Sequence, residues 1–185
     1  MDMITIRHAT PTDASLLADM GAETFSDTFA AQNTPENMAA YLAASFSPEI
    51  QAAELAELGS VFLIAEMVGE AVGYARLKGG STEIGVTGSY PVELVRIYTR
   101  TRWLGQGFGA GLMQACVTEA ARMGGDVLWL GVWERNPRAI RFYQKWGFVR
   151  VGTHVFQMGD DPQTDWIMVR DLPPATFPPD NPILR

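Results

Sequence analysis

A glycine-spaced turn between a short apolar strand and an amphipathic helix constrains this chain more than any other feature. The expected strand is Val92–Thr99, the turn is Trp103–Gly111, and the helix runs from about Gly107 to Met123. Glycines let a backbone approach an anion closely, and a helix N-terminus exposes unpaired N–H groups with a partial positive charge. The pattern therefore predicts that amides of Gly105 to Ala110 hold a phosphate or pyrophosphate group.

Two other interpretations of this turn stay open from its residues alone. It can be a flexible turn that lets helix and strand pack closely, or it can belong to a dinucleotide fold, because Gly105-x-Gly107-x-x-Ala110 fits a loose fingerprint. Glu134 would then stand for the ribose-binding acid, but it lies about thirty residues on rather than about twenty. Three expected strands and three expected helices also come before the strand that leads into the turn, which disfavours the dinucleotide fold.

The order of elements predicts an α+β fold with a mixed central sheet of about seven strands and helices on both faces. Thr10-Pro11, Thr34-Pro35, Ser47-Pro48 and Asn136-Pro137 are helix starts, each with a capping side chain before a proline. We expect residues 1–172 to form one domain and residues 173–185 a proline-rich tail. The expected strands are Ile4–Ala9, Ser60–Gly69, Glu70–Gly79, Val92–Thr99, Val127–Trp133, Gly147–Met158 and Thr164–Leu172.

Composition narrows the class of partner. The net charge of −7 disfavours nucleic acid or an anionic membrane as the main partner, and it either favours a cationic substrate or simply keeps the protein soluble. The N-terminus lacks the pattern of a signal peptide and no apolar run is long enough to span a bilayer, so we expect a cytoplasmic protein. The single cysteine, Cys116, falls on the apolar stripe of its helix, which favours packing over chemistry. The sequence leaves a homodimer open.

Several side chains near the turn are suited to acid–base chemistry. Glu93, an acid within an apolar strand, either faces solvent or acts as a general base toward an ammonium group. Asn136 caps a helix and can also donate from its amide, and Tyr143 lies two turns along on the same face. Its phenol is either a core group or the acid that protonates a departing thiolate. Backbone groups of Ile97 and Thr99 are candidates to pair with an extended ligand arm.

Together these blocks resemble the GCN5-related N-acetyltransferase (GNAT) superfamily, which uses acetyl-CoA. The family's loop pattern, Q/R-x-x-G-x-G/A, maps onto Leu104–Gly109, and its asparagine and tyrosine map onto Asn136 and Tyr143. Leu104 replaces the usual Gln or Arg, and a register beginning at Arg102 would shift the loop against the helix. We therefore expect the backbone to do the binding. The cofactor residues implied are Ile97, Tyr98, Thr99, Leu104, Gly105, Gln106, Gly107, Phe108, Gly109, Ala110, Asn136 and Tyr143.

Three longer segments, Glu23–Leu42, Leu128–Phe148 and His154–Val169, resemble the bacterial Pai-type spermidine/spermine N-acetyltransferases. The resemblance implies direct acetyl transfer to a small primary amine, such as a polyamine, with no covalent enzyme intermediate. It leaves a peptide or amino-acid acetyltransferase and a non-catalytic acetyl-CoA-binding regulator as alternatives. Acids that would attract the amine are Glu23, Asp27, Glu36, Asp160, Asp161 and Asp165, with Asp27 preferred.

The mechanism implied by the resemblance divides the work among four groups. Glu93 binds the amine and removes a proton from it by way of a bridging water molecule. The pantetheine arm lies along Ile97–Thr99, and a backbone N–H near Tyr98 or Thr99 polarises the thioester carbonyl. Tyr143 protonates the leaving thiolate.

Overall fold

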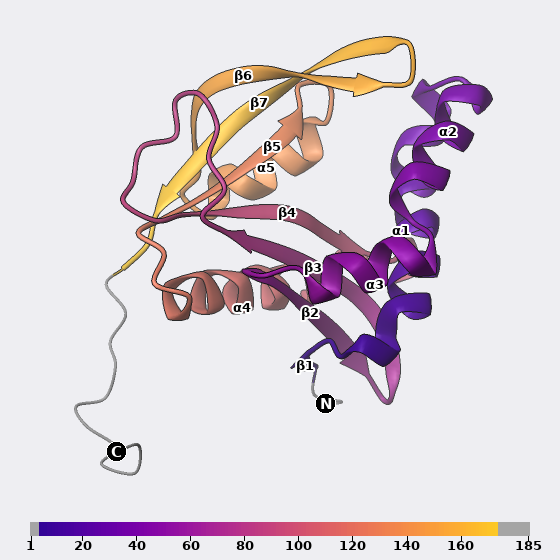
Figure 1. Ribbon diagram of the computed structural model, residues 1–185, viewed down its shortest axis with the longest axis horizontal. Helices are drawn as coiled ribbons and strands as arrows, with labels where there is room; N and C mark the ends of the chain where they lie inside the picture. Colours follow the sequence, from indigo (N-terminus) through magenta and orange to yellow (C-terminus); the bar gives the residue numbers. More distant parts are fainter. Residues whose placement is uncertain (1–3, 174–185) are drawn as a thin grey trace.

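The computed structural model describes residues 4–173, so nearly all of the predicted tail lies outside the described residues. Seven strands form one mixed sheet in the order β1-β2-β3-β4-β5-β7-β6 (Figure 1), which confirms the predicted fold class. The strands are β1 Thr5–His8, β2 Ser60–Met67, β3 Glu70–Gly79, β4 Pro91–Thr99, β5 Val127–Trp133, β6 Val149–Met158 and β7 Asp161–Asp171.

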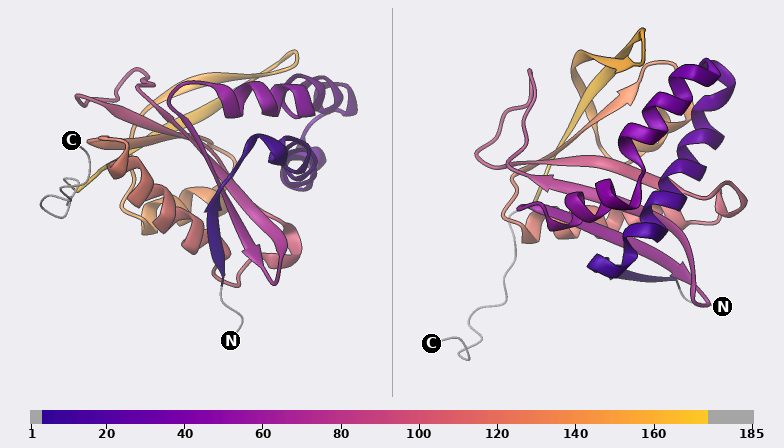
Figure 2. Two further views of the ribbon diagram at one scale, coloured as in Figure 1. Left: turned by 60° about the horizontal axis from the view of Figure 1, so that its bottom comes forward. Right: turned by 45° about the vertical axis from the view of Figure 1, so that its right-hand side comes forward.

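Helices cover both faces of the sheet (Figure 2). One face carries α1, α2 and α3, and the other carries α4 and α5. Alternation along the strands separates the two layers: Leu63 and Leu77 pack with Leu112 of α4, whereas Ile64 and Tyr74 pack with the α1 layer. The helices are α1 Ala14–Phe29, α2 Pro35–Ser45, α3 Pro48–Ala56, α4 Phe108–Arg122 and α5 Pro137–Lys145.

The predicted helix starts are largely confirmed. Thr34 Oγ1 accepts from the Asn37 amide and Ser47 Oγ accepts from the Ile50 amide, each at 3.2 Å. Near Thr10, by contrast, a 3-10 turn (Pro11–Asp13) precedes α1. Cys116 is buried in the core, as expected, and burial raises the pKa of its thiol.

Several element bounds differ from the expectation by one or two residues. The largest difference is in the last strand, which begins at Asp161 rather than Thr164. Pro162 does not prevent the longer strand because it lies at its second residue, next to the turn, where a missing N–H costs least. No helix within residues 4–173 is long and apolar enough to cross a membrane.

The contact between β4 and β5 is the feature that creates the site. All other neighbouring strands are antiparallel, but β4 and β5 are parallel and pair only from Pro91–Glu93 to Val127–Trp129. Beyond Glu93 and Trp129 the two strands have no register with each other. The sheet therefore divides there, and one edge of each strand is left free to meet a ligand.

Candidate functional site

A cavity of about 560 Å³ lies along these free edges. Its lining comes from three groups of elements: the free part of β4 (Leu94–Thr99) with Gly131–Trp133 of β5, the turn before α4 with the start of α5, and α1 with the β6–β7 hairpin. Residues of the cofactor prediction and residues of the α1 layer thus meet in one space. This volume and these mixed walls are typical of a small-molecule site.

The glycine turn has the conformation that an anion cradle requires. Gly105 (φ 77°) and Gly107 (φ 93°) lie in the left-handed region, and Gly107 is the N-cap of α4. The Gly111 amide closes the first helical hydrogen bond onto the Gly107 carbonyl at 2.9 Å. The amides of the three residues between them therefore have no intrahelical acceptor and are available to phosphate oxygens.

Most of the predicted cofactor residues line the cavity. Gln106 and Phe108 do not: the side-chain NH₂ of Gln106 donates to the Arg102 carbonyl at 2.9 Å, and Phe108 is buried against Trp103. Trp103 itself lines the cavity, and its Nε1 is buried with no hydrogen-bond partner among residues 4–173. The predicted cofactor residues that line the cavity are Ile97, Tyr98, Thr99, Leu104, Gly105, Gly107, Gly109, Ala110, Asn136 and Tyr143.

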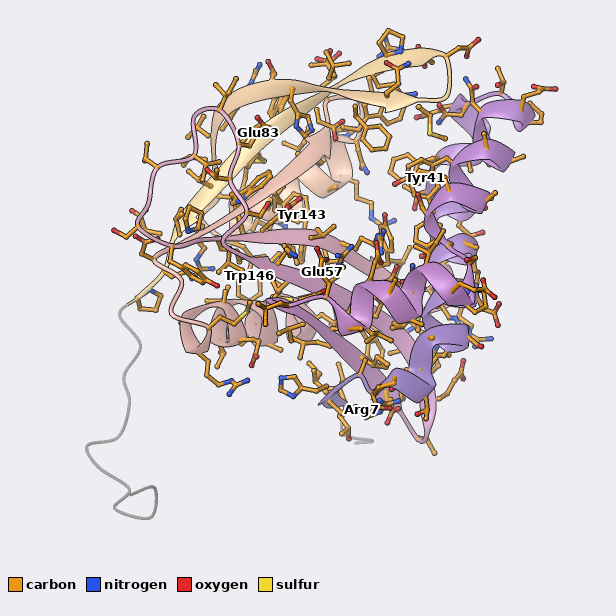
Figure 3. All side chains as sticks on the ribbon, viewed as in Figure 1. Arg7, Tyr41, Glu57, Glu83, Tyr143 and Trp146 are labelled. Atoms are coloured by element: carbon orange, nitrogen blue, oxygen red, sulfur yellow. The ribbon has the colours of Figure 1, made fainter. Side chains whose placement is uncertain are left out.

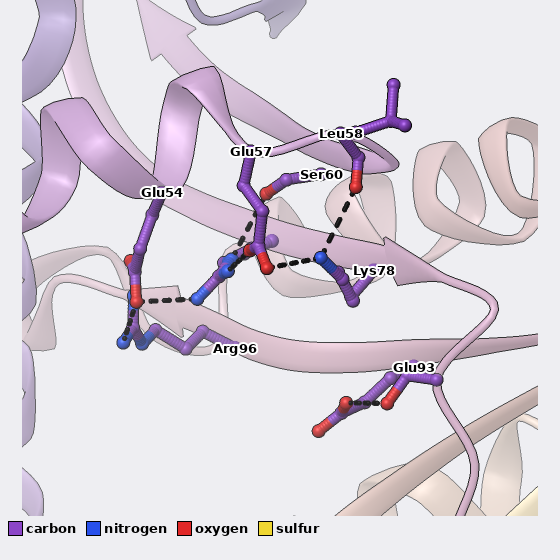
Figure 4. A network of polar contacts seen from close by, with 9 residues as sticks. Glu54, Glu57, Leu58, Ser60, Lys78, Glu93 and Arg96 are labelled. Atoms are coloured by element: carbon purple, nitrogen blue, oxygen red, sulfur yellow. Dashed lines mark hydrogen bonds and ion pairs between the residues drawn. The ribbon is translucent and has the colours of Figure 1, made fainter.

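A β-bulge reshapes β4 where it enters the cavity. Leu77 of β3 pairs with Leu94, and Arg76 pairs with Arg96, so Val95 has no partner in β3. The Arg96 guanidinium makes two hydrogen bonds to Glu54, at 2.5 and 3.0 Å (Figure 4). This pair holds Arg96 in the cavity wall, and Glu54 is shared with Arg76, whose Nη1 lies 2.6 Å from Glu54 Oε1.

Asn136 and Tyr143 reach the cavity from α5. The Asn136 side-chain oxygen accepts from the Ala139 amide at 3.1 Å, so the residue is a helix cap with its NH₂ group left over. Burial raises the pKa of the Tyr143 phenol, which packs against Phe148. Tyr143 therefore stays protonated at neutral pH and can serve as a proton donor.

Glu93 and Asp27 stand apart from the cavity lining. Glu93 lies in the last paired position of β4, opposite Trp129, and its carboxylate accepts from Ser81 Oγ at 2.6 Å. Figure 4 shows it away from the Glu54–Arg96 pair. Asp27 is exposed and accepts from Thr101 Oγ1 at 2.6 Å; of these two residues, Thr101 lines the cavity.

Asp165 is the only carboxylate among the described residues that line the cavity. Its side chain is 14% exposed, and burial raises its pKa while the nearby His154 opposes that shift. A raised pKa suits a carboxylate that must take up a proton near neutral pH. In the sequence, Asp165 stood among six candidate acids, and β7 also carries Asp161, Gln163, Thr164, Arg170 and Asp171, so no local signal singled it out.

Aromatic rings form the wall around Asp165, and the sequence did not reveal this grouping. The rings of Phe25 and Tyr41 stack at 4.3 Å, and Tyr41 meets Phe156 edge-on at 5.5 Å. Phe29 and Trp133 approach at 6.0 Å across the cavity wall. Figure 3 shows Tyr41 on α2, facing the space between α2 and the sheet. Rings of this kind bind apolar groups and stabilise cations over their faces.

Comparisons with known proteins agree with this geometry. The acetyltransferase (GNAT) family model matches residues 22–148. An uncharacterized N-acetyltransferase of Lactobacillus delbrueckii subsp. lactis is 36% identical over 150 residues, which cover 81% of this chain and 87% of the relative.

Two solved structures have the same fold. A GCN5-related N-acetyltransferase from Rhodopseudomonas palustris matches with a TM-score of 0.74 and 22% identity, covering 93% of this chain and 98% of that one. PaiA N-acetyltransferase from Thermoplasma acidophilum, solved in complex with coenzyme A, matches with a TM-score of 0.71 and 21% identity, covering 91% and 99%.

Proposed function

The chain belongs to the GNAT family of acetyltransferases, and we propose that it transfers an acetyl group from acetyl-CoA to a primary amine inside the cavity between β4 and β5. One observation carries the proposal: a single cavity joins the glycine turn at Gly105–Ala110 to a half-buried carboxylate, Asp165. The first suits the cofactor's phosphates and the second suits an ammonium group.

The residues present fit the cofactor. Left-handed Gly105 and Gly107 direct free amides toward a pyrophosphate, and the free edge of Ile97–Thr99 offers backbone partners to the amides of a pantetheine arm. The unpartnered Nε1 of Trp103 is a further donor in the same wall. When bound, acetyl-CoA supplies an acetyl group activated as a thioester.

Side chains and backbone amides of the protein then transfer the protons and polarise the thioester carbonyl. Tyr143, protonated at neutral pH, donates to the leaving sulfur, whose thiol form has a pKa near 8.5. The amide of Val95, in the bulge, and those of Tyr98 and Thr99 are the candidates to polarise the carbonyl. Glu93 takes part as a base only if water links it to the cavity, since it is not among the lining residues.

Within this function we propose a polyamine as the acceptor. The resemblance to Pai-type enzymes, the PaiA structural neighbour, the net charge of −7 and the acidic side chain of Asp165 support it. The aromatic wall around Phe25, Tyr41 and Phe156 favours a second candidate, a monoamine with an apolar body.

A screen that measures release of free thiol from acetyl-CoA tests the proposal. Spermidine, spermine, an aromatic monoamine and a peptide with a free N-terminus are compared by kcat/KM. The proposal expects a polyamine to be the best acceptor. If the monoamine or the peptide is the better acceptor, the polyamine proposal is wrong but the acetyl transfer stands. If acetyl-CoA binds and no amine is acetylated, the enzyme proposal is wrong and a non-catalytic regulator is left.

A further inference from the structure

Three side chains connect the cavity to the protein surface. Asp165 of β7 lines the cavity, and its Oδ2 lies 3.7 Å from His154 Nε2 on β6. His154 Nδ1 lies 3.0 Å from Glu83 Oε2 in the connection between β3 and β4. Figure 3 shows Glu83 on this connection, over β6 and β7, separate from Tyr143. These contacts therefore lead from the cavity to the partly exposed connection between β3 and β4.

Glu83, the outermost of these three side chains, is held in place. The Ile84 amide donates to Glu83 Oε1 at 2.8 Å, and the hydrogen bond with His154 lowers the pKa of Glu83, so the carboxylate stays ionised. An ionised carboxylate only accepts, so it assigns a proton to Nδ1 of His154 and leaves the lone pair of Nε2 toward Asp165. The imidazole is thus oriented to take a proton from the cavity side.

Gly131 keeps the inner end open. It lines the cavity on β5, and a Cβ at this position would lie 3.3 Å from His154 Nε2 and 3.5 Å from Asp165 Oδ2. Any larger residue would crowd the gap between the two side chains. The 3.7 Å separation is longer than a hydrogen bond and is of the kind that shortens when substrate binds.

We propose that Asp165 takes the proton from the acceptor ammonium and passes it through His154 to Glu83 and solvent. This inference rests on the proposed function and names the base of that reaction. The N–H bond of the ammonium breaks and an O–H bond forms on Asp165; that proton moves to His154 Nε2, while the Nδ1 proton leaves through Glu83.

The proton count for one turnover closes. An ammonium and a thioester give an amide, a thiol and one proton. The relay delivers that one proton to solvent, and Tyr143 supplies the thiol proton and recovers its own from the second proton that nitrogen loses. Asp165 is then a catalytic residue, and His154 and Glu83 are positioning residues that act through it.

Other ionisable groups near Asp165 set its electrostatic surroundings. They are Glu134, just after β5, and Tyr41 on α2, besides His154 on β6. Glu134 disfavours the ionised form of Asp165, and His154 favours that form once its Nε2 carries a proton. Of these groups, Glu134 is the other carboxylate, and it is not among the residues that line the cavity.

The test is the pH profile of kcat, from pH 6 to 10, for Asp165→Asn with the best amine of the screen. We expect a loss of about 100-fold at pH 7 with the KM for acetyl-CoA unchanged. The loss should shrink about tenfold per pH unit and vanish near pH 9, because a larger fraction of the amine, whose pKa is near 10.4, arrives neutral as the pH rises. Asp171→Asn, at the far end of the same strand and outside the cavity lining, is the matched control.

Glu83→Gln keeps the cavity carboxylate and tests the outer step. It should lower kcat several-fold and displace the acidic limb of the profile, with its melting temperature close to that of the wild type. An Asp165→Asn profile parallel to the wild type at every pH, or a Glu83→Gln limb that does not move, overturns the relay while the acetyltransferase activity stands. A wild type that acetylates no amine overturns the proposed function itself.

Discussion

Replacing Gly107 with alanine tests whether the turn binds the cofactor through its backbone. Gly107 has φ 93°, and a Cβ there would meet no atom within 4 Å, so the substitution adds backbone strain without a clash. A left-handed conformation costs an alanine about 1–2 kcal/mol. The chain either keeps the turn and loses that stability, or relaxes the turn and misdirects the amides.

The relaxed turn should raise the KM for acetyl-CoA about tenfold, since 1.4 kcal/mol corresponds to a factor of ten. Gly124→Ala is the matched control: Gly124 has φ 86°, equally open surroundings, and a place at the other end of α4. Both variants should lower Tm by roughly 2–4 °C per kcal/mol, but only Gly107→Ala should change the KM. Equal KM values in the two variants, together with an unchanged Tm in Gly107→Ala, would refute backbone binding, because a relaxed turn would then bind the cofactor as well as the native turn does.

Three further predictions concern other parts of the molecule. Tyr143→Phe should lower kcat more than tenfold at constant Tm, whereas Glu93→Gln should lower it less than tenfold, because Glu93 does not line the cavity; the reverse order in steady-state kinetics would restore Glu93 as the base. Arg138→Ala should raise the KM for acetyl-CoA several-fold because Arg138 lines the cavity. Arg141 lies outside the lining, so an equal rise in Arg141→Ala would show that the protein's overall charge, and not a contact in the cavity, causes the effect. Asp13→Asn should destabilise the protein by about 2 kcal/mol at pH 7, because two hydrogen bonds from Arg7 lower the pKa of Asp13 from 3.8 to about 2. This contribution to stability is present above pH 3.8 and is lost as the pH falls toward 2. Thermal melts of that variant between pH 2 and 7 should therefore show a flatter acid limb than the wild type.

Local patterns predicted the elements and the turn because their causes lie close together in the chain. Thr34, Ser47 and Asn136 each cap a helix within three residues of themselves, and Gly105 and Gly107 form the predicted turn, in the left-handed conformation that glycine allows. Such features depend on nearby backbone groups and can be predicted from a single sequence.

The acceptor side of the site depends on pairing between distant segments. Period-two alternation puts Glu93 and Ile97 on one face, but the bulge at Val95 breaks that alternation, and Glu93 falls in the last residue pair before β4 and β5 separate. Asp165 enters the cavity because β7 pairs with the whole length of β5, which places Asp165 opposite Trp133. Neither the bulge nor the end of the β4–β5 pairing has a local signature.

A crystal structure with coenzyme A tests the central claim most directly. We expect the pyrophosphate within hydrogen-bond distance of the amides of Gly107–Ala110, and the thiol in the cavity between Tyr143 and Asp165. Coenzyme A bound elsewhere, or bound with its thiol away from both side chains, would contradict the assignment of the two ends of the cavity.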